Sequence, residues 1–165
     1  MLIQWKDNKK GISIIELLIV IAIIAIALTS LLGIASFSLR VSTLIKETTQ
    51  ANTLAQETIE AVRNFRDGTD WNTNGLGTLT PDVAYYPQKT ADIPPKWSLI
   101  LGEETINGFT RKVIFQEVSR DSVTGDIEDI YNSNNDDPNT RKSMATVAWE
   151  EKEIEIVTYL TNWKQ

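Results

Sequence analysis

The fold of this chain is decided by residues 12–39, which read ISIIELLIVIAIIAIALTSLLGIASFSL. Of these 28 residues 21 are apolar, and none of the residues 17–39 is charged. Because a helix rises about 1.5 Å per residue, the uncharged run is roughly 34 Å long as a helix, enough to cross a bilayer core of about 30 Å. The sequence therefore predicts an apolar, membrane-spanning helix near the amino terminus.

The residues before this run predict its orientation. Lys6, Lys9 and Lys10 precede it, against the single acid Asp7. Basic residues beside a span stay on the cytoplasmic side, so residues 40–165 are expected outside the cytoplasm. A secretory signal peptide fits less well, because its apolar region has only about 7–15 residues. A plain signal anchor stays open as an alternative.

Glu16 is the one charged residue within residues 12–39. A carboxylate in apolar surroundings is costly unless it reaches water or meets an opposite charge. Composition alone leaves both readings open, a side chain that reaches water at the membrane edge and a side chain that has a partner.

Residues 9–20, KKGISIIELLIV, resemble the amino-terminal signal of type IV prepilins and pseudopilins. That signal is a basic leader, Gly, an apolar residue, Ser or Thr, two apolar residues, Glu and a long apolar helix. The resemblance implies cleavage after Gly11 by a prepilin peptidase, and methylation of the new amino terminus, Ile12. This family usually has Phe at the position of Ile12. Loss of three Lys and one Asp with the leader changes the net charge from −6 to −8.

The resemblance also implies roles for Glu16 and Gly33. In a filament the apolar helices pack together, and the Glu16 carboxylate pairs with the free amine of Ile12 on a neighbouring subunit, which sets the axial register. Gly33 stands where many pilins carry a Pro. Gly weakens a helix interior and also permits close helix packing, so both local melting and packing are open readings.

The helical pattern continues through residues 41–65, where apolar and small residues recur at spacings of three or four. No Pro interrupts residues 12–66, and Gly68 is a plausible stop signal after Arg63 and Arg66. We expect one helix from about Ile12 to about Arg66, apolar in its first half and amphipathic in its second.

The remaining sequence predicts a loop followed by a small sheet. Residues 67–95 read as an extended loop, and strands are expected over residues 96–101, 109–119, 143–150 and 154–161. Three or four antiparallel strands packed on the helix give an α+β, pilin-like fold. The predicted divisions are a leader (1–11), a transmembrane or filament-core half of the helix (12–39), an amphipathic half (40–66), and a connecting loop with the sheet (67–165).

Two acidic segments raise the question of calcium. Residues 70–75 match the first half of a calcium loop but lack its final Glu, so a solvated turn is preferred. Residues 120–140 are also acidic, and major pseudopilins bind calcium in a loop near the sheet. A solvated loop without a cofactor is the prediction here, and calcium is the alternative, with the candidate ligands Asp126, Asp129, Asp136 and Asp137.

Composition excludes several function classes. The chain has no Cys and no His, which removes thiol catalysis and the usual general base. Residues 40–165 hold 13 basic and 20 acidic residues, which argues against a nucleic-acid partner. No nucleophile–base set or phosphate loop is evident, so no enzyme activity is predicted.

The predicted function is a structural subunit, a pilin or minor pseudopilin, of a type IV pilus or a type II secretion-like filament. Its implied partners are the prepilin peptidase, other pilin or pseudopilin subunits, and an inner-membrane assembly platform. Secretion, adhesion, motility and competence filaments share this signal, so the sequence does not choose among them. The alternative is a monomeric, signal-anchored extracytoplasmic binding module.

Overall fold

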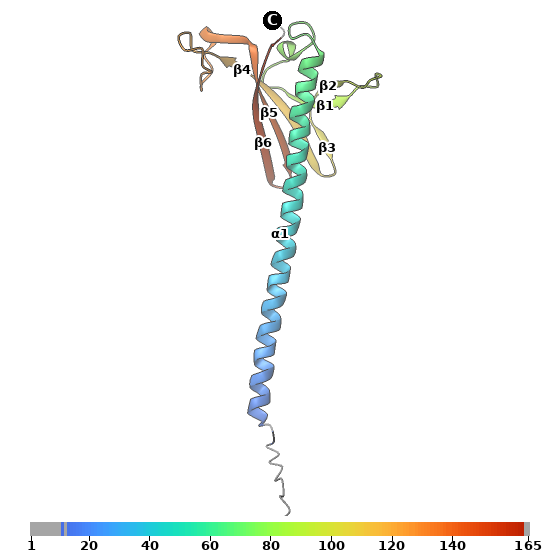
Figure 1. Cartoon of the computed structure of the whole chain (residues 1–165), viewed down its shortest axis with the longest axis vertical. Coiled ribbons are helices and arrows are strands. Elements are labelled where there is room, and N and C mark those ends of the chain that lie inside the picture. The colour runs from blue at the N-terminus through green and yellow to red at the C-terminus, as the bar shows by residue number, and fades with distance from the viewer. Residues whose placement is uncertain (1–10, 12, 164–165) are drawn as a thin grey trace, which may run out of the picture. The chain divides into compact units, whose positions relative to one another are not determined.

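The computed structural model describes residue 11 and residues 13–163. It begins with one long helix, α1 (Ile14–Gly68), and six strands follow in the described residues (Figure 1). The strands are β1 (Ala84–Lys89), β2 (Trp97–Leu101), β3 (Glu104–Ile106), β4 (Phe109–Ser119), β5 (Asp136–Trp149) and β6 (Lys152–Thr161). Two short 3-10 helices are also present, η1 (Leu76–Thr78) between α1 and β1 and η2 (Ser133–Asn135) between β4 and β5. The predicted α+β class is confirmed.

The chain divides into two compact units, the first ending at Lys46 and the second beginning at Glu47. In the first unit the described part is helical from Ile14 onward, and the amide of Leu17 donates to the carbonyl of Ser13 at 3.1 Å. The predicted helix start, Ile12, lies outside the described residues. Every residue from 14 to 40 is exposed to the surroundings.

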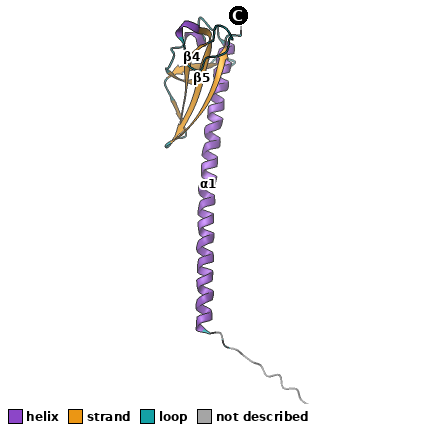
Figure 2. Cartoon of the chain, turned by 90° about the vertical axis from the view of Figure 1, so that its left-hand side faces the viewer, coloured by secondary structure: helices purple, strands orange, loops and turns teal. Residues whose placement is uncertain are grey.

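In the second unit, the carboxyl-terminal part of α1 packs on the sheet (Figure 2). Its buried residues follow the predicted stripe, because they lie on one side of the helix: Ala51, Ala55, Thr58, Ile59, Ala61 and Val62. The helix ends at Gly68 with Arg66 in its last turn, so the predicted stop is confirmed.

The sheet is antiparallel, with strand order β2-β1-β4-β5-β6 and β3 beside β4. Across its helix-facing side, Val113 on β4 is opposite Ala145 on β5, which is opposite Ile156 on β6. One core cluster joins Val62 of the helix to Val113 and Phe115. A second joins the helix to the other end of β4 and β5, with the residues Ala51, Ala55, Phe109, Val147 and Trp149.

Arg111 ties α1 to the sheet through charge. Its side chain is only 5% exposed, and its Nη2 lies 2.6 Å from a carboxylate oxygen of Glu104 on β3. Its Nη1 lies 3.3 Å from a carboxylate oxygen of Glu57 on the helix. The two acids lie on different elements and meet at one buried guanidinium, which fixes how the helix sits on the strands, because a buried cation needs opposite charge beside it.

Several sequence expectations for the sheet are wrong in detail. The sheet has six described strands rather than three or four, and residues 67–95 contain η1 and β1 rather than an uninterrupted loop. The sequence pattern did not indicate β1, because Pro87 stands inside this strand. β1 is held by its neighbours, since it pairs with β2 on one side and with β4 on the other. The short strand β3 was also not predicted.

The third predicted strand begins earlier than expected. β5 starts at Asp136, inside the predicted acidic loop 120–140, and not at Ser143. Pairing with β4 and β6 extends the strand, because Arg141 is opposite both Glu117 and Leu160. Polar residues in this part of the strand concealed it, since strand patterns are recognised from apolar alternation.

Candidate membrane and assembly helix

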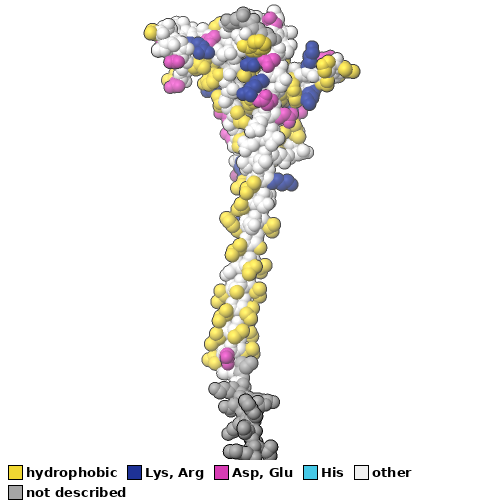
Figure 3. All heavy atoms as spheres, viewed as in Figure 1, with side chains coloured by type: hydrophobic (Ala, Val, Ile, Leu, Met, Phe, Trp, Pro, Cys, Tyr) yellow, Lys and Arg dark blue, Asp and Glu magenta, His cyan; other side chains and the backbone are white. Residues whose placement is uncertain are grey.

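The first part of α1 presents a large apolar surface. All 16 large apolar residues within residues 14–39 are at least 48% exposed, and Figure 3 shows their side chains along this part of the helix. Burial of one such side chain is worth about 1.5–3 kcal/mol, so leaving all of them in water would cost tens of kcal/mol. A surface of this size needs lipid or other helices around it.

The length and composition of this helix agree with a membrane span. An 18-residue window near its amino terminus has a mean hydropathy of 3.0, and no residue of that window is buried. The helix is thus a candidate membrane anchor, as the sequence predicted.

Two hydroxyl groups within the apolar surface, those of Thr29 and Ser30, are satisfied by the helix itself. Thr29 donates to the carbonyl of Ala25 at 3.0 Å, and Ser30 donates to the carbonyl of Ile26 at 2.8 Å. A polar group in hydrocarbon needs such an internal partner. These bonds let the helix carry Thr29 and Ser30 in an apolar medium without a partner from another chain.

Glu16 lies in the first turn of α1. The turn's free amides favour a carboxylate there. Its side chain is exposed among apolar neighbours, and no ion pair to it is formed within residues 13–163. The carboxylate is therefore placed at the start of the helix and is open to a partner from outside this chain.

The structure places only part of the predicted processing signal. Gly11 is exposed, and a Cβ added to it would meet no atom within 4 Å. Lys6, Lys9, Lys10 and Ile12 lie outside the described residues.

Gly33 lies within the continuous helix, and a Cβ there would also meet no atom within 4 Å. It therefore packs against no other described part of its own chain. Its two readings, local melting and packing against a neighbouring helix, both stay predictions.

The four calcium candidates have different surroundings, and Asp126 is exposed. Asp137 accepts hydrogen bonds from Nε of Arg120 and Oγ1 of Thr140, each at 2.6 Å, and Asp136 accepts one from the hydroxyl of Tyr131. Burial raises the pKa of Asp137, but the hydrogen bonds from Thr140 and Arg120 outweigh it and hold that pKa below its usual value. Asp137 is thus already paired with a cation of its own chain.

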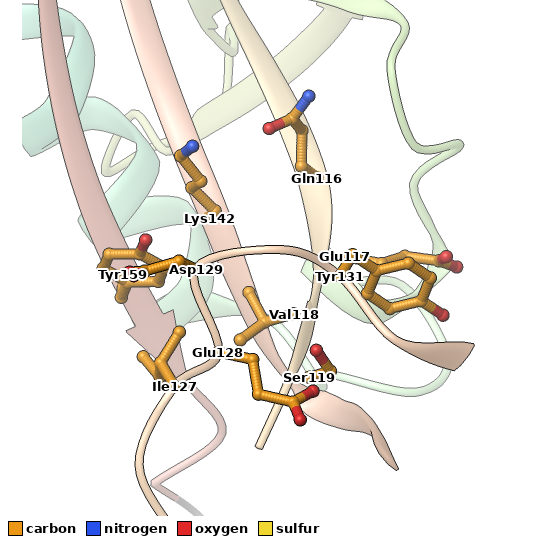
Figure 4. A pocket seen from close by; sticks show the side chains of 10 residues that line it. All are labelled: Gln116, Glu117, Val118, Ser119, Ile127, Glu128, Asp129, Tyr131, Lys142 and Tyr159. Atoms are coloured by element: carbon orange, nitrogen blue, oxygen red, sulfur yellow. The ribbon is translucent and has the colours of Figure 1, made fainter. Parts of the chain in front are cut away.

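Asp129 instead lines a small pocket of about 80 Å³ on the outer side of β4, β5 and β6 (Figure 4). Burial and the carboxylates of Glu117 and Asp136 raise the pKa of Tyr131, another lining residue, to about 12. Among the described residues no group of three or more acidic side chains is arranged to hold a metal ion. The loop without a cofactor stays the prediction and calcium binding its alternative. Calorimetric titration of the chain with calcium chloride tests the two: binding heat supports calcium, and its absence rejects calcium.

The other acidic segment is a turn held by its own side chains. Oδ1 of Asp70 accepts from the amides of Asn72 and Thr73, both at 3.1 Å, and Oδ1 of Asn74 accepts from the amide of Asp70. These are the bonds of Asx turns, so residues 70–74 form the turn that the sequence predicted.

Together, a long amino-terminal helix with an exposed apolar half and an antiparallel sheet on its other half are consistent with a pilin-like architecture. Comparison with protein families finds the prokaryotic N-terminal methylation motif at residues 6–32. The chain therefore carries the type IV prepilin-like signal that its sequence suggested, and this motif marks structural, pilin-like proteins. No curated protein and no solved structure matches the chain.

Proposed function

We propose that this chain is a structural subunit, a pilin or minor pseudopilin, of a type IV pilus or a type II secretion-like filament, and not an enzyme. A prepilin peptidase removes residues 1–11 on the cytoplasmic side, and the apolar half of the helix holds the subunit in the membrane until an assembly platform moves it into the filament. The sheet and the amphipathic half of the helix form the extracytoplasmic head.

The observation that carries this proposal is the coincidence of two features. The prokaryotic N-terminal methylation motif covers residues 6–32, and the helix that contains most of it has no buried residue between 14 and 40. A helix that is apolar on all sides and uncovered by its own chain is suited first to lipid and then to a bundle of like helices.

Glu16 supplies the register of assembly in this proposal. Its carboxylate has no partner in the described chain, and removal of residues 1–11 creates a free amine four residues before it. In a low-dielectric bundle, a carboxylate of one subunit and an amine of the next stabilise only the arrangement that brings them together. The pair thus selects one axial offset between subunits.

The test is the variant Glu16→Ala in the full chain, measured in sheared filaments and in membranes. We expect leader removal to stay intact and the filament share to fall about tenfold or more, because a buried charge without its partner costs about 3–5 kcal/mol. The matched control is Glu155→Ala, which removes an exposed carboxylate from β6 and should assemble normally. Normal assembly of Glu16→Ala would reject the register role, and a chain that never enters filaments would favour the monomeric, signal-anchored module.

A further inference from the structure

The second unit carries an apolar cavity between the end of α1 and the start of β2. Its volume is about 210 Å³, and its walls include Phe65 of the helix and Pro95 and Trp97 of the hairpin that joins β1 to β2. A cavity of about 150 Å³ in a protein can accept a benzene molecule, so this one has room for a branched aliphatic side chain. Lys89 lies over the Trp97 ring, 5.0 Å from its centroid.

The same hairpin ends in an apolar side chain that its own chain leaves uncovered. Ile93 is 99% exposed, and Figure 1 shows the β1–β2 hairpin ending away from the body of the sheet. Although Ile93 stands only two residues before the cavity wall at Pro95, it does not fill that cavity. One chain thus carries an exposed aliphatic side chain, Ile93 (the knob), and a cavity of suitable size for it. Within that chain the knob does not fill the cavity.

The charges beside the two features are opposite. Asp92 directly precedes Ile93, and its only described hydrogen bond is with Oγ1 of Thr90. Lys96 lines the cavity and forms no ion pair within the described residues. Because Asp92 adjoins Ile93 and Lys96 lines the cavity, a second copy that places Ile93 in the cavity can also pair its Asp92 with Lys96, which adds charge complementarity to the apolar fit.

We propose that the β1–β2 hairpin is a contact between neighbouring copies of this chain, in which Ile93 of one copy enters the cavity lined by Phe65, Pro95 and Trp97 of the next, and Asp92 pairs with Lys96. The contact rests on the proposed function, because a filament places copies side by side. It adds a head-to-head contact to the helix contacts, and a knob and a cavity at different places of one surface can repeat from copy to copy.

The absence of Cys in the chain allows a direct test with single introduced thiols. Two differently tagged full chains are expressed together, one with Ile93→Cys and one with Asn64→Cys at the cavity wall, and are oxidised mildly in membranes and in sheared filaments. The inference predicts a disulfide-linked pair that carries both tags. The matched control replaces Ile93→Cys with Val123→Cys, a residue 91% exposed in another loop, and should give background linkage only.

A charge exchange sharpens the result. Asp92→Lys on the knob chain should lower the cross-link yield about threefold, as for the loss of an exposed ion pair, and Lys96→Glu on the cavity chain should restore it. The inference is overturned if the yield of the doubly tagged pair is no higher than that of the Val123→Cys control in membranes and also in filaments. It is overturned as well if the Asn64→Cys chain links only to a different protein. Absence of filaments would count against the proposed function alone, since the cross-link is read in membranes as well.

Discussion

Residues 14–40 and 47–68 belong to the same helix, yet they keep their apolar side chains in different surroundings. The first part is apolar on all sides, and none of its residues is buried. The second part has one apolar stripe, and that stripe is covered by the chain's own sheet. Helix propensity does not separate the two parts, but the angular spread of apolar residues does, because a stripe can be covered by one sheet and a full cylinder cannot.

Because only residues 47–68 of the helix pack on the sheet, substitutions of buried residues should destabilise the second unit and leave residues 14–40 unaffected. Phe115→Ala should lower the free energy of unfolding by about 3–5 kcal/mol, because a fully buried ring leaves a cavity. Ile24→Ala, its control in the first part, should leave that unfolding unchanged. Tryptophan fluorescence of the detergent-solubilised chain reports the transition, since Trp71, Trp97 and Trp149 all lie in the second unit. Equal destabilisation by both variants would contradict the comparison.

A charge introduced into the apolar residues 14–40 should impair membrane integration without affecting the folding of the second part. Leu28→Arg places a charge near the middle of the uncharged run, which costs about 2.5–3.5 kcal/mol at the centre of a membrane span. We expect the membrane-integrated fraction to fall steeply in carbonate extraction, while the fluorescence of the head stays unchanged. Thr53→Arg, an exposed site in the second part, is the control and should stay integrated. Full integration of Leu28→Arg would show that residues 14–40 do not enter the bilayer.

A smaller effect concerns the acidic segment of the head. Asp137→Asn should cost about 1–2 kcal/mol at neutral pH, because its charged hydrogen bonds with Arg120 and Thr140 are weakened. The pKa of Asp137 is lowered below its ordinary 3.8, so its contribution is complete above that value and is lost as the pH falls through the folded pKa. Chemical unfolding should therefore separate the two proteins most at pH 7, and the difference in their free energies of unfolding should shrink as the pH falls below 3.8. A difference in the free energy of unfolding that stays the same at every pH would exclude the Asp137–Arg120 ion pair as its cause.

The smallest effect belongs to the contact between α1 and the β5–β6 turn. Nζ of Lys152 lies 3.0 Å from a carboxylate oxygen of Glu47, and this hydrogen bond raises the Lys152 pKa above its ordinary 10.5. The stabilisation is present below pH 10.5 and is lost as the pH rises through the folded pKa. Glu47→Gln should be slightly less stable than the wild type at pH 7 in low salt, and the difference should vanish at high salt. A difference that persists at high salt would point to packing instead.

How far the sequence predicted this molecule depended on the kind of signal. The apolar run and the amphipathic stripe of α1 each repeat over many residues, and Gly68 marks the end of the helix. The helix was therefore predicted to within about two residues at each described end. β1 and the first residues of β5 were missed, because Pro87 and Asp136 are locally unfavourable in strands and are held there by neighbouring strands. The signal around Gly11 and Glu16 was readable as a motif, whereas the cavity at Phe65 and Trp97 joins residues far apart in sequence and leaves no local pattern.

The intact mass of the chain purified from membranes tests most directly whether this protein is processed as a prepilin. Cleavage after Gly11 gives a chain that begins at Ile12, with or without a methyl group on its amine, and the same mass is expected in sheared filaments. Gly11→Glu, which alters the residue before the predicted cleavage, should leave the precursor at full length and absent from filaments. A wild-type chain that keeps Met1 in the membrane, or that is cut at a residue other than Gly11, would show that it is not a processed pilin-like subunit.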